Sequence, residues 1–131
     1  LVRDPSRFDC IVTGNMFGDI LSDEASEISG SLGLAGSVMA GDDACCAQAQ
    51  HGSAPDIQGQ DKANPTSLIL SAVMLFEWLA ARHRRPEFEQ AAKAIEAAID
   101  AALQSPDTRT ADLKGKLGTR AFAAHIAGLI G

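Results

Sequence analysis

The sequence predicts a fold of the α/β class, in which strand and helix patterns follow one another along the chain. Residues 8–13 are rich in β-forming side chains and end at Gly14, and a helical pattern follows them directly. This order is typical of a buried strand in a parallel sheet. Two further long segments carry apolar residues at helical spacing, which favours helices packed on a common core. The 131 residues correspond to one domain's worth of chain.

The first helix is expected at residues 18–28, where apolar side chains recur on one side. Three glycines at every third position, Gly30, Gly33 and Gly36, should end this pattern. Residues 36–50 are small and polar without a regular period, so we expect mostly loop or short strand there.

The longest helix is expected from Asn64 to about His83, with Asn64 as its cap and Pro65 at its first position. Residues 68–79 leave little polar face, so this helix should be buried nearly all round, inside a larger domain or against a neighbour. The basic residues at its end complement the negative end of the helix dipole: Arg82, His83, Arg84 and Arg85.

A further helix is expected from Pro86 to about Gln104, because apolar residues form a stripe that should face the core. The Ser105-Pro106 pair should end it. Residues 110–118 then form a short extended and turning segment. Thr119 is expected to cap a last helix, whose apolar side carries Phe122, Ile126 and Ile130.

The composition excludes several classes of protein. Seventeen acidic residues against eleven basic ones give a formal charge of -6, which argues against a protein that binds nucleic acid or an anionic membrane surface. No run of about 18 apolar residues marks a transmembrane helix. The three cysteines include an adjacent pair, which favours reduced, cytoplasmic thiols over a disulfide framework. Because the chain enters a strand-like pattern soon after Leu1, we expect it to be the C-terminal part of something longer.

A loop at residues 51–57 is the first candidate binding site. Its small residues, Gly52 among them, would let a ligand approach backbone N–H groups, and Pro55 stiffens the turn. The carboxylate of Asp56 could accept hydrogen bonds from a hydroxyl pair such as that of a ribose. An ordinary surface turn before a helix explains the same residues equally well.

A second candidate site consists of Asp19 and Asp23, which lie four residues apart. This spacing places both carboxylates on one face of a helix, where their charges repel. A divalent cation would relieve the repulsion, and carboxylate oxygens suit Mg²⁺ or Mn²⁺. The alternative is a solvated acidic helix start with both side chains exposed.

The two stretches, FDCIVTGNMFGDILSDEASEISGSLGL and HGSAPDIQGQDKANPTSLILSAVMLFEWL, resemble in sequence and order the C-terminal part of the β-decarboxylating dehydrogenases. This is the isocitrate/3-isopropylmalate dehydrogenase family, and the resemblance covers nearly the whole chain. It implies an α/β two-domain fold of which only the C-terminal part is present. Residues 1–35 would belong to the smaller, dimer-forming domain, and residues 36–131 to the C-terminal part of the larger, cofactor-binding domain.

The resemblance also implies an activity, namely the NAD- and metal-dependent oxidative decarboxylation of a small 2-hydroxy acid of the isocitrate or 3-isopropylmalate type. Asp19 and Asp23 match the metal-ligand aspartates of the family, which adds a further aspartate from the partner subunit of a homodimer. Asn15 matches a residue near the nicotinamide. The adenosine-binding loop is matched by His51, Gly52, Ser53, Ala54, Asp56, Ile57 and Asn64. Of these, His51 and Asn64 would contact adenine, and Asp56 the ribose.

Cofactor choice follows from charge, because Asp56 would repel the extra ribose phosphate of NADP. The Asp56-Ile57 pair resembles the NAD type, whereas NADP-dependent members tend to carry Lys-Tyr. Gln48 departs from the family, which often has Glu there. The family's substrate-binding arginines and its catalytic Tyr and Lys lie upstream of this region, and this chain contains no Tyr. We therefore assign no catalytic residue to this chain.

Two other functions remain open. The chain could belong to a tartrate- or homoisocitrate-type member of the same family. It could also be a catalytically incomplete nucleotide-binding fragment or regulatory subunit. Asp19 and Asp23 favour the enzyme, since a silent subunit has no need of them, whereas the missing acid/base pair favours the fragment.

Overall fold

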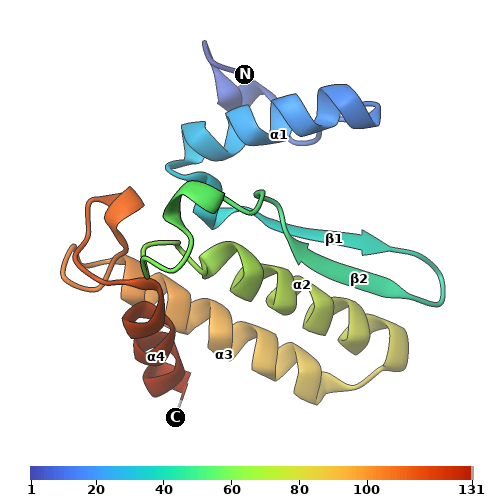
Figure 1. Ribbon diagram of the computed structural model, residues 1–131. Helices are drawn as coiled ribbons and strands as arrows, with labels where there is room; N and C mark the ends of the chain where they lie inside the picture. The colour runs from blue at the N-terminus through green and yellow to red at the C-terminus, as the bar shows by residue number, and fades with distance from the viewer. Residues whose placement is uncertain (131) are drawn as a thin grey trace.

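The structure is a computed structural model that describes residues 1–130 (Figure 1). It contains four α-helices, one β-hairpin and four short 3₁₀ turns among these residues. The elements in chain order are η1 (Pro5–Arg7), α1 (Asn15–Ser29), η2 (Leu32–Leu34), β1 (Gly36–Ala40), β2 (Cys45–Ala49), η3 (Pro55–Ile57), α2 (Thr66–His83), α3 (Pro86–Leu103), η4 (Ala111–Leu113) and α4 (Thr119–Ile130). The mixed α/β class predicted from the sequence is confirmed.

The hairpin of β1 and β2 lies between α1 and α2 (Figure 1). Its strands are antiparallel, with Gly36 opposite Ala49 and Ala40 opposite Cys45. Two buried serines of α2 attach it to the helix. The hydroxyl of Ser71 donates to Gln48 O (2.6 Å) and accepts from Ser37 N (3.0 Å), and Ser67 bonds both Ala35 O and Gln50 N. Polar α2 side chains thus satisfy the hairpin backbone where the two elements meet.

The core lies where α2, α3 and α4 meet. Its buried apolar residues come from α3 and α4, and partly buried side chains of α2 pack against them. The buried set is Ala98, Ile99, Ala102, Phe122 and Ile126. The predicted stripe of the 86–104 helix is therefore confirmed as core.

Residues 1–130 alone do not bury α2 nearly all round, so the predicted cover by a larger domain or a neighbour stays a prediction. Leu68 is 57% exposed, and the buried residues of α2 are three hydroxyl-bearing side chains together with Val73. The reason is geometric, because α2 packs chiefly on the hairpin and on α3 and the described chain leaves its remaining side open.

The strand predicted at residues 8–13 is also absent from the described structure. A strand is stabilised by a hydrogen-bonded neighbour, and the sheet found in residues 1–130 consists of β1 and β2 only. The side chain of Val12 is 93% exposed and that of Phe8 is 50% exposed, so this segment is not buried. The helix that follows it begins at Asn15, earlier than predicted.

Of the two predicted helix caps, Asn64 does bond the first turn of α2, but Thr119 does not cap α4. The Oδ1 of Asn64 accepts a hydrogen bond of 3.0 Å from Thr66 N, so Asn64 does satisfy the first turn of α2, although the helix begins at Thr66. Thr119 is the first residue of α4, but its hydroxyl donates to Ala63 O (2.5 Å). The cap of α4 is instead the carboxylate of Asp61, which accepts from Arg120 N (3.0 Å). None of the helices described here is long and apolar enough to cross a membrane.

Candidate functional site

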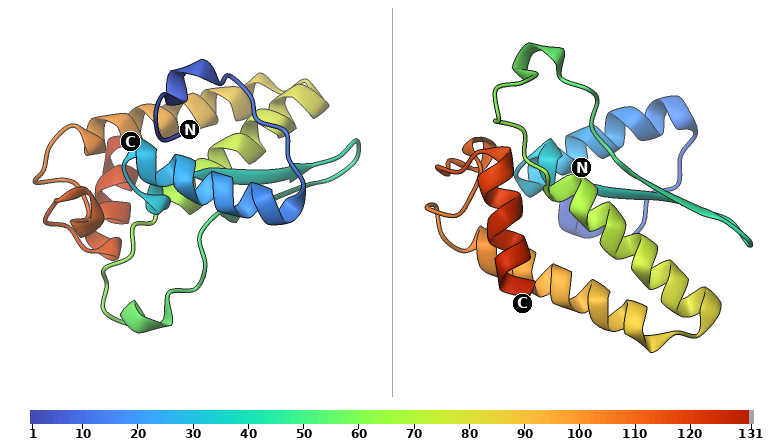
Figure 2. Two further views of the ribbon diagram at one scale, coloured as in Figure 1. Left: turned by 90° about the horizontal axis from the view of Figure 1, so that it is seen from above. Right: turned by 60° about the horizontal axis from the view of Figure 1, so that its bottom comes forward.

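The loop at residues 51–64 borders a cavity of about 580 Å³, a size typical of small-molecule sites. The loop carries η3 and projects away from the helices in both views of Figure 2. Every residue assigned to the adenosine loop lines this cavity except Asp56: His51, Gly52, Ser53, Ala54, Ile57 and Asn64. The structure therefore brings together, around one cavity, most of the residues predicted to bind the adenosine.

The shape of this loop comes from three residues in the left-handed conformation, which lie on either side of η3. Ala54 has φ 41°, Gly59 has φ 75° and Asp61 has φ 54°. A glycine adopts this conformation readily, but alanine does so at a cost in energy. A hydrogen bond from Ile57 N to Ala54 O (3.1 Å) closes the turn. A Cβ added at Gly52 would meet nothing within 4 Å, so the backbone there borders open space that a ligand could enter.

The carboxylate of Asp56 is exposed on η3 and is not part of the cavity lining. Its backbone carbonyl accepts a hydrogen bond of 2.8 Å from Gln60 Nε2. The charged side chains that do line the cavity are Asp61, Lys62, Asp112 and Arg120. The predicted contact between Asp56 and a ribose thus stays a prediction.

The far end of the loop is held by the start of α4. Asp61 O accepts from Thr119 N (3.1 Å), while Asp61 Oδ1 accepts from Arg120 N (3.0 Å). Gly118 lies so close that an added Cβ would come within 2.6 Å of Asp61 O. Two chain segments separated by more than fifty residues therefore form one wall of the cavity.

Asn64 forms the next part of the wall, and its side chain is almost completely engaged. It is 7% exposed, and its Oδ1 accepts from both the N–H and the hydroxyl of Thr66 (3.0 and 2.6 Å). Its Nδ2 donates to Asp112 Oδ2 (3.0 Å). An amide nitrogen carries two N–H groups, so one is left for a ligand such as adenine.

Asp112 links this wall to the end of α1. The same Oδ2 that accepts from Asn64 also accepts from the hydroxyl of Ser31 (2.5 Å). Burial acts to raise the pKa of Asp112, but hydrogen bonds, that of Ser31 foremost, outweigh it and hold the pKa below its usual value. Sequence reasoning missed Ser31 and Asp112, and because they lie 81 residues apart no local pattern could have paired them.

The predicted metal ligands lie elsewhere, on α1. Asn15, Asp19 and Asp23 follow one another at four-residue spacing on one stripe of this helix, and all three are exposed. Carboxylate oxygens fit Mg²⁺ or Mn²⁺, but the described residues supply no cluster of three or more His, Cys, Asp or Glu. The carboxylates of Asp19 and Asp23 are therefore suitable ligands for the ion, but they are too few to bind it alone. Neither they nor Asn15 line the cavity at residues 51–64.

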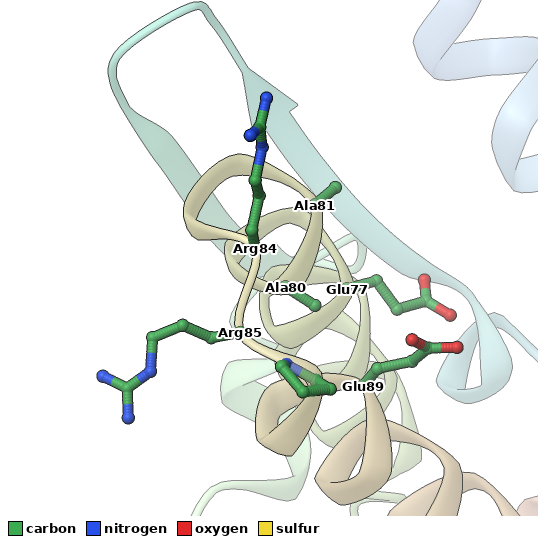
Figure 3. A pocket seen from close by; sticks show the side chains of 7 residues that line it. Glu77, Ala80, Ala81, Arg84, Arg85 and Glu89 are labelled. Atoms are coloured by element: carbon green, nitrogen blue, oxygen red, sulfur yellow. The ribbon is translucent and has the colours of Figure 1, made fainter.

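A second cavity, of about 480 Å³, lies where α2 turns into α3 and contains none of the predicted site residues. Figure 3 shows that Arg84 and Arg85 extend away from it, while Glu77 and Glu89 point to one side together. Arg85 pairs with Glu87 (2.5 Å), and Glu89 pairs with Lys93 (2.6 Å). These exposed pairs are typical of a solvated helix turn, so this cavity is not a candidate site.

Comparison with known proteins gives consistent results. The isocitrate/isopropylmalate dehydrogenase family matches residues 1–126. A 3-isopropylmalate dehydrogenase of Synechococcus is 46% identical over 96% of this chain, and an isocitrate/homoisocitrate dehydrogenase of Thermus thermophilus is 48% identical over the same share. The isocitrate dehydrogenase structure from Methylococcus capsulatus superposes with a TM-score of 0.88 at 38% identity, covering 98% of this chain and 37% of that one. This chain spans 35% of the length of both curated relatives.

Proposed function

The chain belongs to the isocitrate/isopropylmalate dehydrogenase family, and from that premise we propose that it supplies the adenosine-binding part of an NAD-dependent β-decarboxylating dehydrogenase. The observation that carries the proposal is the shared cavity at residues 51–64, lined by all but one of the residues that the family resemblance assigns to the adenosine loop. A cavity of about 580 Å³ has room for the adenosine half of a dinucleotide.

In this role the residues of the chain bind and orient the nucleotide. The remaining N–H of Asn64 would donate to the adenine ring, and the open backbone at Gly52 would lie beside it. The basic side chains of Lys62 and Arg120 on the same cavity would offset the negative charge of the cofactor's phosphates. Bound at this loop, NAD would supply the acceptor for the hydride of the substrate's hydroxyl-bearing carbon.

We further propose that the cofactor is NAD and not NADP. Asp56 follows the turn that lines the cavity, and its negative charge disfavours a second anion on the ribose. The carboxylate could instead accept hydrogen bonds from the two free ribose hydroxyls.

We also propose a divalent-cation site that is completed by a second subunit. Asp19 and Asp23 would hold Mg²⁺ or Mn²⁺, which when bound acidifies the substrate hydroxyl and stabilises the charge left by loss of CO₂. Two carboxylates are too few for either ion, so further ligands must come from other chain segments, including a partner subunit. The exposed apolar side chains of α1, Met16, Phe17 and Ile20 at 61–67% exposure, favour a homodimer formed through this helix.

The test is NADH formation by the full-length protein with isocitrate, 3-isopropylmalate, homoisocitrate or tartrate, each with Mg²⁺ and with a chelator. We expect turnover of one of these acids that depends on both NAD and the ion. Absence of turnover with all four acids, with metal present, would overturn the proposal that the protein is an enzyme.

A second candidate function is a catalytically incomplete, nucleotide-binding member of the family. Its support is that the cavity at residues 51–64 is lined without any contribution from Asp19 or Asp23. NAD binding without turnover would identify this second function.

A further inference from the structure

Asp112 is the polar centre of the cavity wall, and no local sequence pattern singles it out. Its Oδ2 accepts hydrogen bonds from Ser31 Oγ (2.5 Å) and from Asn64 Nδ2 (3.0 Å). All three residues line the cavity of the nucleotide loop. Ser31 and Asn64 are both buried, at 6% and 7% exposure. One carboxylate oxygen therefore fixes two buried side chains that come from distant parts of the chain.

The position of this oxygen decides where Asn64 points. The Oδ1 of Asn64 is held by Thr66, and the side-chain amide can turn about a single bond unless its nitrogen is also held. Asp112 Oδ2 supplies that second constraint. With it, the other N–H of the amide is set in one direction, and the ordering cost is met before a ligand binds.

The same oxygen links the nucleotide cavity to α1. Ser31 lies just beyond the end of this helix, and the contacts that α1 makes with other described elements are chiefly to η2, which follows Ser31. The hydroxyl of Ser31 also accepts from Gly33 N (3.1 Å). Asp112 therefore connects the turn after α1 to Asn64, which lies just before α2.

We propose that Asp112 is a positioning residue for nucleotide binding: it holds Asn64 in the orientation that receives the adenine and joins the end of α1 to the cavity. This inference rests on the proposed nucleotide site and adds to it a residue that contacts no nucleotide in our assignment. It acts as a hydrogen-bond acceptor, so an amide oxygen at the same place should replace it.

The test compares NAD affinity, by isothermal titration calorimetry of the full-length protein, among the wild type, Asp112→Ala, Asp112→Asn and Asp100→Ala. Circular dichroism identifies a temperature at which all of them are folded. Loss of the acceptor in Asp112→Ala should weaken NAD binding about tenfold. Asp112→Asn keeps an oxygen that can accept from both partners and should stay within about twofold of wild type. Asp100→Ala, on the exposed face of α3, should leave the affinity unchanged.

The outcomes separate the two claims. If the wild type does not bind NAD, the proposed nucleotide site itself is wrong. If the wild type binds NAD and Asp112→Ala binds it equally well, the nucleotide site stands and the positioning role is overturned. A merely structural role would lower the unfolding temperature of Asp112→Ala without changing its affinity while folded. If Asp112→Ala does not fold, Ser31→Ala and Asn64→Ala each remove one of the two side chains that donate to Asp112. An unchanged NAD affinity in both of these variants would overturn the inference.

Discussion

The carboxylate of Asp61 caps helix α4, because its Oδ1 accepts a hydrogen bond of 3.0 Å from the N–H of Arg120, 59 residues later. The backbone carbonyl of Asp61 also accepts from Thr119 N (3.1 Å). The nucleotide loop and the last helix are therefore joined at one residue. The stability of α4 and the shape of the cavity depend on the same contact.

Replacing Asp61 by alanine should destabilise the protein. The variant loses a cap worth about 1 kcal/mol, and it places alanine at φ 54°, a conformation that asparagine tolerates better. Asp61→Asn keeps an acceptor oxygen and should lose distinctly less stability. Urea unfolding of the three proteins measures the difference, and equal losses in the two variants would show that the cap is not what Asp61 contributes.

Glycine at position 33 is required by close packing against the cavity wall. A Cβ at Gly33 would lie 2.7 Å from Asn64 Cβ, so Gly33→Ala should cost about 1–3 kcal/mol of stability and should also weaken NAD binding. Gly128 is the matched control, because it lies within α4 and a Cβ there meets nothing within 4 Å. Gly128→Ala should stabilise by about 0.5–1 kcal/mol. Urea unfolding and NAD titration of both variants test this, and an unaffected Gly33→Ala would contradict the described packing.

The pH dependence of stability should carry the signature of Asp112. Its hydrogen bonds lower its pKa in the folded protein, so its ionised form stabilises the fold above about pH 3.9, the usual value for aspartate. That contribution should be lost as the pH falls through the lower, folded-state pKa. Unfolding free energies of wild type and Asp112→Asn, measured from neutral to acidic pH, should therefore converge at low pH. The pKa values of Glu87 and Glu89 are also lowered, but both residues are present in both proteins, so their effect on the difference in unfolding free energy cancels. If that difference stays constant with pH, the role assigned to Asp112 is wrong.

Cofactor preference should respond to the charge at position 56. Asp56→Lys replaces a carboxylate that disfavours the extra phosphate of NADP by a cation that attracts it. The ratio of NADP to NAD affinity should rise by about tenfold or more. The control is Asp42→Lys, which makes the same charge change at an exposed position outside the cavity lining. An unchanged ratio in Asp56→Lys would show that this loop does not contact the adenosine ribose.

The sequence predicted those features that depend on local pattern. Helix spacing, the Pro86 start and the Asn64 contact with the next helix turn were all recognisable, and the cavity gathers the residues of the Gly52 loop. Features that depend on distant partners were not recognisable. The prediction for residues 64–83 assigned no role to the serines of α2, whereas Ser71 hydrogen-bonds to the hairpin backbone.

The strand predicted at residues 8–13 failed for the same physical reason. Its composition suits a strand, but a strand needs a neighbour, and the described residues offer none to Phe8 or Val12. The sequence predicts Thr119 as the cap of α4, whereas the structure uses Asp61, which lies beside the start of this helix but 59 residues before Arg120 in the chain. The partners of Asp112 were invisible for the same reason, because hydrogen bonds over 48 and 81 residues leave no periodic signal.

The most direct test of the account is a titration of the isotopically labelled wild-type protein with NAD, followed by the backbone amide signals. The account predicts saturable binding, with the largest shifts at residues 51–64 and at the amides around Ser31 and Asp112, and weaker binding of NADP. Absence of binding, or shifts confined to the α2–α3 turn at Arg84 and Arg85, would contradict it.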